Sequence, residues 1–246
     1  MTAKKFQYPT VDVWANLPVG CCYPRMIALM DEGGISHICL SAWSRPGQMI
    51  FSNAEVAWYT RAYLDRVFGL AAVDLHKPVE AVRELEHYVK VEGFVGLRVV
   101  PRQWNLPPTN PHYWPLFVKC IELDIPFLTQ VGHTAPTCPS EDPSAAETVA
   151  VAWKHNNVYI ETSAWSPKYY VPEFINFANT TGREKVMFGT NFPQLGWKAC
   201  VHNANAHLVG TKDGLRERVV KSFMGGNALR VLKLPSVNLD SLNASL

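Results

Sequence analysis

Three amide side chains stand where strands of this sequence are predicted to end. Lys185–Pro193 is an apolar run closed by Gly, Thr, Asn and Pro residues, which is typical of a buried strand that presents Asn191 at its carboxyl end. Gln130 lies near the end of a second predicted strand, and Asn16 follows a third. Amide side chains donate and accept hydrogen bonds without carrying charge. We therefore expect these residues to hold the oxygen atoms of a small ligand.

His133 is the histidine best placed for acid–base chemistry. It follows Gln130 just beyond a predicted strand, and no other histidine is expected at the carboxyl end of a strand. An imidazole titrates near neutral pH and can therefore give and take a proton. We predict His133 as the catalytic acid or base, with Asn191 and Gln130 beside it. The alternative is a structural histidine that hydrogen-bonds a loop.

Aromatic and cationic side chains are also expected at the strand ends. Indole rings there, together with Phe192, would form an apolar mouth suited to a flat unsaturated ligand. Arginines just past strand ends could grip a carboxylate with two parallel hydrogen bonds. The predicted substrate-binding residues are Asn16, Trp14, Trp43, Arg45, Arg102 and Trp165. In the alternative interpretation, the aromatic residues cap the core and the arginines are solvated.

The elements that would position these side chains alternate between strands and helices, as in parallel α/β folds. Apolar runs predict seven strands, at Val11–Trp14, Ile35–Trp43, Phe68–Asp74, Gly96–Val100, Phe127–Val131, Val158–Ala164 and Val186–Thr190. Helical patterns lie at Ala54–Val67, Val79–Val91, from Asn110 onward, and at Ala145–His155, Pro172–Thr180 and Leu215–Phe223. The 246 residues fit a single (β/α) barrel domain, and the polar tail 234–246 is expected to be loose.

The interval between Val131 and Val158 is short for a complete barrel. A strand–helix–strand unit takes about 30 residues or more, and here about 26 residues would have to contain two helices and a strand. Thr134–Ser144 is polar and Pro-rich. We predict irregular chain in place of one strand there, and hence an incomplete barrel of about seven strands.

Several of these segments resemble the amidohydrolase-2 family, the metal-dependent hydrolases and decarboxylases related to aminocarboxymuconate-semialdehyde decarboxylase. Val11–Pro18 is similar to the first strand of that family, and Lys185–Pro193 is similar to its last strand. The other similar segments are Gly93–Arg98, Ile125–Gly132, Asn157–Ala164 and Gly225–Ala228. The resemblance covers about Pro9 to Leu232 and implies a TIM-type (β/α) barrel of the metal-dependent hydrolase superfamily.

The resemblance also implies metal ligands, and this sequence replaces them. Trp14 and Asn16 stand for the His-x-His pair of the family, Gln130 for its fifth-strand histidine, and Asn191 for its aspartate. An indole does not ligate a metal, and neutral amide oxygens are weak donors for Zn²⁺. The family usually binds a divalent metal such as Zn²⁺, but we expect no tightly bound metal cofactor here.

The resemblance implies a hydrolase or carboxy-lyase that acts on a small aromatic or unsaturated carboxylate. Two alternatives remain open. One is a catalytically inactive barrel that binds a small molecule or a partner protein. The other is a truncated family member, in which the loss of one strand leaves exposed sheet edges.

Composition and charge exclude several other classes. A net charge of +2 gives no basic stripe for nucleic acid, and no apolar run reaches the ~18 residues that span a bilayer. The six cysteines form no CxxC pair, which favours free thiols in a reducing compartment. We therefore expect a cytoplasmic protein without a signal peptide, with a small-molecule substrate and a possible homo-oligomeric state.

Overall fold

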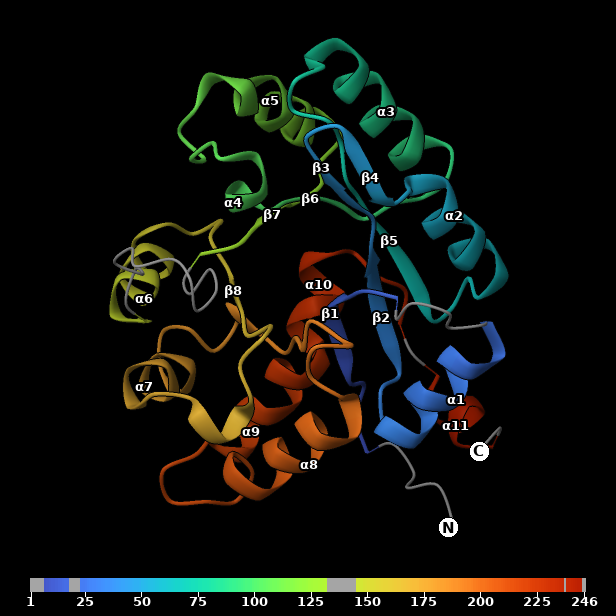
Figure 1. Ribbon diagram of the computed structural model, residues 1–246. Coiled ribbons are helices and arrows are strands. Elements are labelled where there is room, and N and C mark those ends of the chain that lie inside the picture. Colours follow the sequence, from blue (N-terminus) through green and yellow to red (C-terminus); the bar gives the residue numbers. More distant parts are fainter. Residues whose placement is uncertain (1–6, 18–22, 132–144, 237, 245–246) are drawn as a thin grey trace. The chain divides into compact units, whose positions relative to one another are not determined.

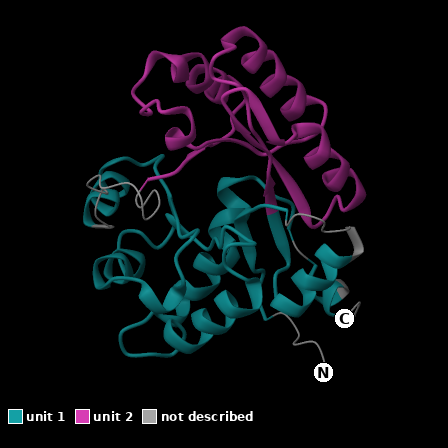
Figure 2. Cartoon of the chain, in the orientation of Figure 1, with its two compact units in different colours: residues 1–38, 143–246 teal, residues 39–142 magenta. Residues whose placement is uncertain are grey.

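The structure is a computed structural model that describes residues 7–17, 23–131, 145–236 and 238–244 (Figure 1). The chain divides into two compact units (Figure 2). Unit 1 consists of residues 1–38 and 143–246, and unit 2 consists of residues 39–142. The single domain expected from the sequence stays a prediction.

Unit 1 contains the first and the last strands of the chain. These are β1 (Val11–Ala15), β8 (Ile160–Glu161) and β9 (Val186–Met187), and β8 pairs in parallel with β9. Beyond the end of β9, Phe192 forms a parallel bridge with Ala15 of β1. The carboxyl ends of β1 and β9 therefore meet.

Helices make up most of the rest of unit 1. Phe223 of the π-helical turn packs edge to face at 6.0 Å against Phe188, which follows β9, and both are buried in the core. The helices are α1 (Tyr23–Gly33), α6 (Ala145–Lys154), α7 (Pro172–Asn179), α8 (Trp197–His207), α9 (Glu217–Lys221), α10 (Asn227–Val231) and α11 (Leu239–Ala244), with a 3-10 turn at Pro167–Tyr169 and a π-helical turn at Ser222–Gly226.

Unit 2 holds strands that lie in the order β2, β5, β6 and β7. Strand β2 (His37–Ser41) begins in unit 1 and ends in unit 2. The others are β5 (Val67–Ala71), β6 (Gly96–Val99) and β7 (Phe127–Thr129), with β5–β6 and β6–β7 paired in parallel. The remaining elements are the hairpin β3 (Trp43–Arg45) and β4 (Gln48–Phe51), and the helices α2 (Asn53–Ala62), α3 (Pro78–Lys90), α4 (Pro101–Trp104) and α5 (Trp114–Glu122), the last preceded by a 3-10 turn at Pro111–Tyr113.

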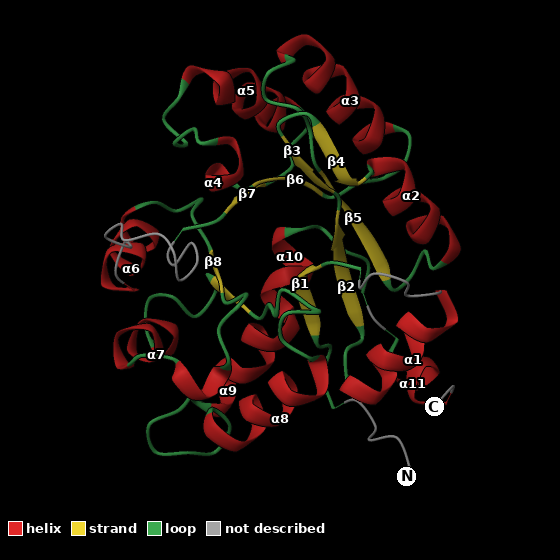
Figure 3. Ribbon diagram, viewed as in Figure 1, coloured by secondary structure: helices red, strands yellow, loops and turns green. Residues whose placement is uncertain are grey.

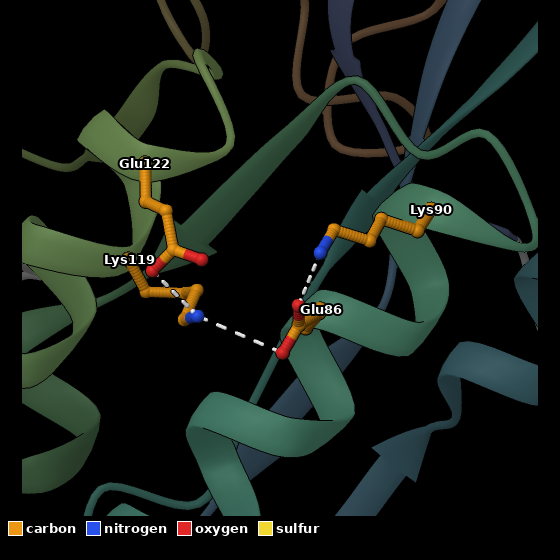
Figure 4. A network of polar contacts seen from close by, with 4 residues as sticks. All are labelled: Glu86, Lys90, Lys119 and Glu122. Atoms are coloured by element: carbon orange, nitrogen blue, oxygen red, sulfur yellow. Dashed lines mark hydrogen bonds and ion pairs between the residues drawn. The ribbon is translucent and has the colours of Figure 1, made fainter.

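Ion pairs link α3 to α5 on the surface of unit 2 (Figure 4). Lys119 Nζ lies 2.7 Å from Glu122 Oε2 and 3.6 Å from Glu86 Oε2, and Lys90 also pairs with Glu86. The hydrogen bond from Lys90 and the charge of Lys119 hold the pKa of Glu86 below its ordinary value. Because exposed ion pairs contribute little free energy, the apolar faces of the two helices must supply most of their attachment.

The observed elements follow the sequence pattern closely (Figure 3). All seven predicted strands are present, and the α/β class is confirmed. β1 is one residue longer than predicted, and the other six strands are shorter. The predicted strand Ile35–Trp43 is wrong at its end, because β2 stops at Ser41 and Trp43 begins the unpredicted hairpin. Gly47, with a φ of 70°, makes the hairpin turn in a conformation that glycine adopts without steric cost.

The remaining comparisons concern the interval after β7, the C-terminal tail and two helices. The irregular chain predicted at Thr134–Ser144 lies outside the described residues. The tail contains a short helix, α11, where only loose chain was expected. Helices α1 and α8 were not predicted from the sequence. Among the helices that the structure describes, none combines the length and hydropathy needed to cross a membrane.

Candidate functional site

The carboxyl ends of β1 and β9 meet in an amide pair. Asn16 Nδ2 donates a hydrogen bond of 2.8 Å to Asn191 Oδ1 and one of 3.1 Å to the carbonyl oxygen of Phe192. The backbone joins the same segments, since Asn16 N donates to Phe192 O at 2.7 Å and Asn191 N donates to Trp14 O at 2.9 Å. Two predicted site residues far apart in the sequence are thus direct neighbours.

The conformation of Asn191 is specific to this turn. Its φ of 57° lies in the left-handed region, which Asn tolerates better than most residues. Its Nδ2 donates to Gln194 Oε1 at 2.6 Å, while its Oδ1 accepts from Asn16. Both ends of the Asn191 amide are therefore engaged, and its orientation is held by neighbouring side chains.

A buried carboxyl group supports the amide pair. Asp12 of β1 is fully buried and accepts hydrogen bonds from Thr190 N at 2.9 Å, Thr190 Oγ1 at 2.5 Å, Trp197 Nε1 at 2.7 Å and Trp14 N at 3.2 Å. Burial raises the pKa of Asp12 to about 6, although these hydrogen bonds oppose the increase. Asp12 is thus a structural hydrogen-bonder, and it positions the backbone next to Asn191.

The donor set at the amide pair does not fit a tightly bound divalent metal. The residues at these ligand positions are an indole, Trp14, and two amides, Asn16 and Asn191. The Asn191 oxygen already accepts a hydrogen bond, and amide oxygens are weak donors for Zn²⁺. In the part of the chain that the structure describes, no group of three His, Cys, Asp or Glu residues could hold a metal ion.

The carboxyl end of β8 carries a second polar group in unit 1. Glu161 Oε2 accepts a hydrogen bond of 2.8 Å from Ser163 N. A Cβ at Gly189 would lie 2.4 Å from Ser163 Oγ and 2.6 Å from Glu161 Oε2, so glycine leaves the space that both side chains occupy. The hydroxyl of Ser163 is buried without a hydrogen-bond partner among the described residues. Such a group commonly binds an ordered water molecule.

Unit 2 has a small cavity at the carboxyl ends of β2, β5 and β6. Its volume is about 10 Å³, the space of roughly one water molecule. It is lined by Ala42, Trp43, Ser44, Ala72, Arg98, Val99, Val100, Gln103 and Trp104. Barrel proteins place their ligand sites at this end of the strands.

Three contacts of charged or polar groups organise this cavity. The guanidinium of Arg98 lies 5.5 Å from the centre of the Trp43 ring and donates to Ser41 Oγ at 3.0 Å. Trp43 Nε1 donates to Gln103 Oε1 at 2.6 Å. Trp43 was predicted as a site residue, whereas Arg98 was not. The signal that could have found Arg98 is a charged residue inside an otherwise apolar strand.

The other predicted site residues lie in different surroundings. Trp165 is 54% exposed, whereas Trp14 is 3% exposed and buried in the core. Arg45 is exposed on β3, where its Nε donates to Gln48 Oε1 at 2.8 Å, and Arg102 is exposed on α4. Gln130 follows β7 and is half-buried. His133 lies outside the described residues.

Two histidines lie in well-defined surroundings. His37 of β2 is 3% exposed, and its Nδ1 lies 2.8 Å from Ser36 Oγ, so it is part of the core. His76 follows β5, and its ring packs edge-on against Trp104 of the unit 2 cavity at 5.4 Å. His76 therefore lies beside the lining of this cavity, a position that its place in a loop did not indicate.

Comparisons with known proteins bear on these sites. The family described as Amidohydrolase matches residues 45–150 and 132–234. Gamma-resorcylate decarboxylase from Polaromonas sp. (strain JS666 / ATCC BAA-500) is 30% identical over 134 residues, which amount to 46% of this chain and 40% of that protein. The matched part thus spans less than half the length of this curated relative.

Solved structures extend the likeness over most of the chain. A 2,6-dihydroxybenzoate decarboxylase from Rhizobium superposes with a TM-score of 0.68 at 17% identity, covering 93% of this chain and 99% of that one. A dihydroxybenzoic acid decarboxylase from Polaromonas sp. JS666, with bound manganese and 2-nitroresorcinol, gives 0.67 at 19% identity and coverages of 95% and 99%. A 5-carboxyvanillate decarboxylase from Sphingomonas paucimobilis gives 0.63 at 16% identity and coverages of 85% and 82%. At these identities the likeness concerns the fold.

Proposed function

This chain belongs to the amidohydrolase family and has its TIM-barrel type of α/β fold, and from that premise we propose that it is a carboxy-lyase for a small aromatic carboxylate. The sequence left hydrolysis and decarboxylation open. The similar proteins described above are decarboxylases of hydroxylated benzoates, which favours decarboxylation. We further propose that the reaction proceeds without a tightly bound metal.

The observation that carries this proposal is the Asn16–Asn191 amide pair. It occupies the positions where the family resemblance places a histidine and an aspartate. Amides hold phenolic or carboxylate oxygens by hydrogen bonds but do not supply the charge that a divalent cation needs. Both N–H groups of Asn16 Nδ2 are used within this turn, so the pair supports orientation of the substrate through the second N–H of Asn191 Nδ2.

The proposed reaction needs one proton at a ring carbon. Protonation of the carbon that carries the carboxylate precedes cleavage of the C–C bond, whose electron pair returns to the ring as CO₂ leaves. His133 is our candidate for the group that delivers this proton, because an imidazole titrates near neutral pH. Hydroxyl groups on the ring favour the step by donating electron density to the protonated carbon.

A direct assay tests the proposal. We expect purified protein dialysed against a chelator to release CO₂ from 2,6-dihydroxybenzoate or 5-carboxyvanillate, at a rate that added Mn²⁺ or Zn²⁺ leaves unchanged. His133→Ala should lower this rate by about 10²–10⁴-fold. His155→Ala, an exposed site next to α6, is the matched control and should keep the rate. A rate that depends on added metal would overturn the metal-independent part of the proposal.

A non-catalytic binding protein is the second candidate function. It is favoured by Asn191, because an amide cannot act as a base where the family carries an aspartate. In that case calorimetry should detect binding of 2,6-dihydroxybenzoate while no CO₂ is released and His133→Ala leaves the affinity unchanged. If the chain is instead a truncated family member, we expect neither binding nor turnover, and a broad thermal transition. The two segments matched to the family overlap at residues 132–150, and this overlap contains Thr134–Ser144, where irregular chain is predicted in place of a strand.

A further inference from the structure

Strand β6 places a permanently charged side chain inside unit 2. All four residues of β6 are buried, and Arg98 among them is 5% exposed. Removing a guanidinium from water is costly unless the structure provides compensating contacts, and Arg stays protonated under all physiological conditions. A chain that only needed to fill this space could use an apolar residue, as it does at Leu97 and Val99.

The contacts of Arg98 fix its orientation. Its Nη1 donates to Ser41 Oγ at 3.0 Å, and its guanidinium lies 5.5 Å from the centre of the Trp43 ring. A cation near an indole face is attracted to it electrostatically. The Arg98 side chain is therefore held in place before any ligand binds, and binding costs less conformational entropy. The guanidinium is therefore pre-organised, with five N–H donors arranged in a planar fork.

Gln103 adds a second donor group to the same cavity. Its Oε1 accepts from Trp43 Nε1 at 2.6 Å, so this contact sets which end of the amide faces the indole. The Nε2 group carries two further N–H donors. Arg98 and Gln103 both line the cavity at the carboxyl ends of β2, β5 and β6, and the indoles of Trp43 and Trp104 flank them.

We propose that Arg98 and Gln103 form a carboxylate-binding subsite of unit 2, which takes the carboxylate group of a small aromatic acid. The free space of about 10 Å³ accommodates one oxygen atom of the carboxylate in place of one water molecule. The aromatic ring stays outside this space, next to the flanking indoles. A planar carboxylate matches the guanidinium fork.

This inference rests on the proposed function only for the identity of the ring, and its test uses a ligand that is not decarboxylated by the proposed chemistry. Benzoate lacks the ring hydroxyls that assist protonation, so its binding can be measured by calorimetry whether or not the protein turns over a substrate. We expect benzoate to bind the full chain at millimolar concentration or below.

Substitutions at the subsite give the decisive comparison. Arg98→Gln should weaken benzoate binding by about 10–100-fold, the usual effect of losing hydrogen bonds to a charged group. Arg83→Gln removes the same charge from an exposed position on α3 and is the matched control, with unchanged affinity expected. Arg98→Lys keeps the charge but loses the fork and should also bind weakly.

A second variant keeps the test valid if Arg98→Gln fails to fold. Gln103→Ala changes a half-buried residue of α4 and should weaken benzoate binding several-fold while the melting temperature stays close to that of the parent. Wild-type affinity in Arg98→Gln, or in Gln103→Ala, would overturn the subsite. So would an absence of benzoate binding to the parent. In that last case, CO₂ release from 2,6-dihydroxybenzoate would still stand as an independent test of the proposed function.

Discussion

Asp12 and Thr190 are joined by two hydrogen bonds, from the backbone N–H of Thr190 at 2.9 Å and from its hydroxyl at 2.5 Å. The two residues belong to opposite ends of the chain, and the contact closes β1 against the segment that follows β9. Trp197 of α8 donates to the same carboxyl group at 2.7 Å. One buried side chain thus connects three elements of unit 1 directly behind the Asn16–Asn191 pair.

We expect Asp12→Asn to destabilise the protein by about 1–3 kcal/mol at pH 7, because the new amide N–H₂ would face groups that are themselves donors. Urea unfolding followed by circular dichroism measures this change. Asp65→Asn, at an exposed position beside α2, is the control and should be neutral within about 0.5 kcal/mol. An Asp12→Asn midpoint equal to that of the parent would show that the carboxyl group is not needed for this closure.

The pKa of Asp12 predicts a pH dependence. Burial raises this pKa from 3.8 to about 6, so between these values the folded state holds a proton that the unfolded state has released. The contribution of Asp12 to the free energy of unfolding is therefore fully present below about pH 4. It is lost as the pH rises through 6, by up to about 3 kcal/mol. The stability difference between the parent and Asp12→Asn should shrink from pH 4 to pH 7 in urea titrations. A difference that grows over this range would contradict the raised pKa.

Two adjacent glycines in the π-helical turn should respond oppositely to alanine. A Cβ at Gly225 would lie 2.3 Å from the carbonyl oxygen of Pro9, a backbone atom that cannot rotate away. At Gly226 the nearest atom is 3.4 Å away, an ordinary contact. We expect Gly225→Ala to cost about 1–3 kcal/mol through overpacking, and Gly226→Ala to be neutral or stabilising by up to about 1 kcal/mol. Thermal unfolding of both variants checks this, and equal melting temperatures would contradict it.

The donor set at the amide pair predicts the metal content. Protein purified without added metal should contain less than one Zn²⁺ or Mn²⁺ per chain by elemental analysis, because an indole and neutral amides replace strong donors. The triple variant Trp14→His, Asn16→His, Asn191→Asp restores imidazole and carboxylate donors and should retain more metal. About one metal ion per parent chain, lost on chelation together with activity, would contradict the expectation.

The sequence by itself determined the fold class and the positions of the seven strands. Apolar runs and helical patterns are local properties, so they predict β1 at Val11–Trp14 and α6 at Ala145–His155 within one residue of the observed ends. The hairpin at Trp43–Phe51 escaped prediction because its strands have only three and four residues, and an apolar run as short as Met49–Phe51 is too brief to indicate a strand by itself. The family was also recognisable from short segments, since these retain the strand patterns after the ligands have changed.

Only the tertiary structure decided which side chains meet. The sequence placed Asn16 and Asn191 at strand ends, but their direct hydrogen bond depends on the closure of β1 against the end of β9, which no local pattern encodes. The sequence likewise favoured Arg45 and Arg102, which follow strands, whereas the structure buries Arg98 beside Trp43. A charged residue in an apolar run does not reveal whether a partner compensates its burial, because that partner comes from another strand.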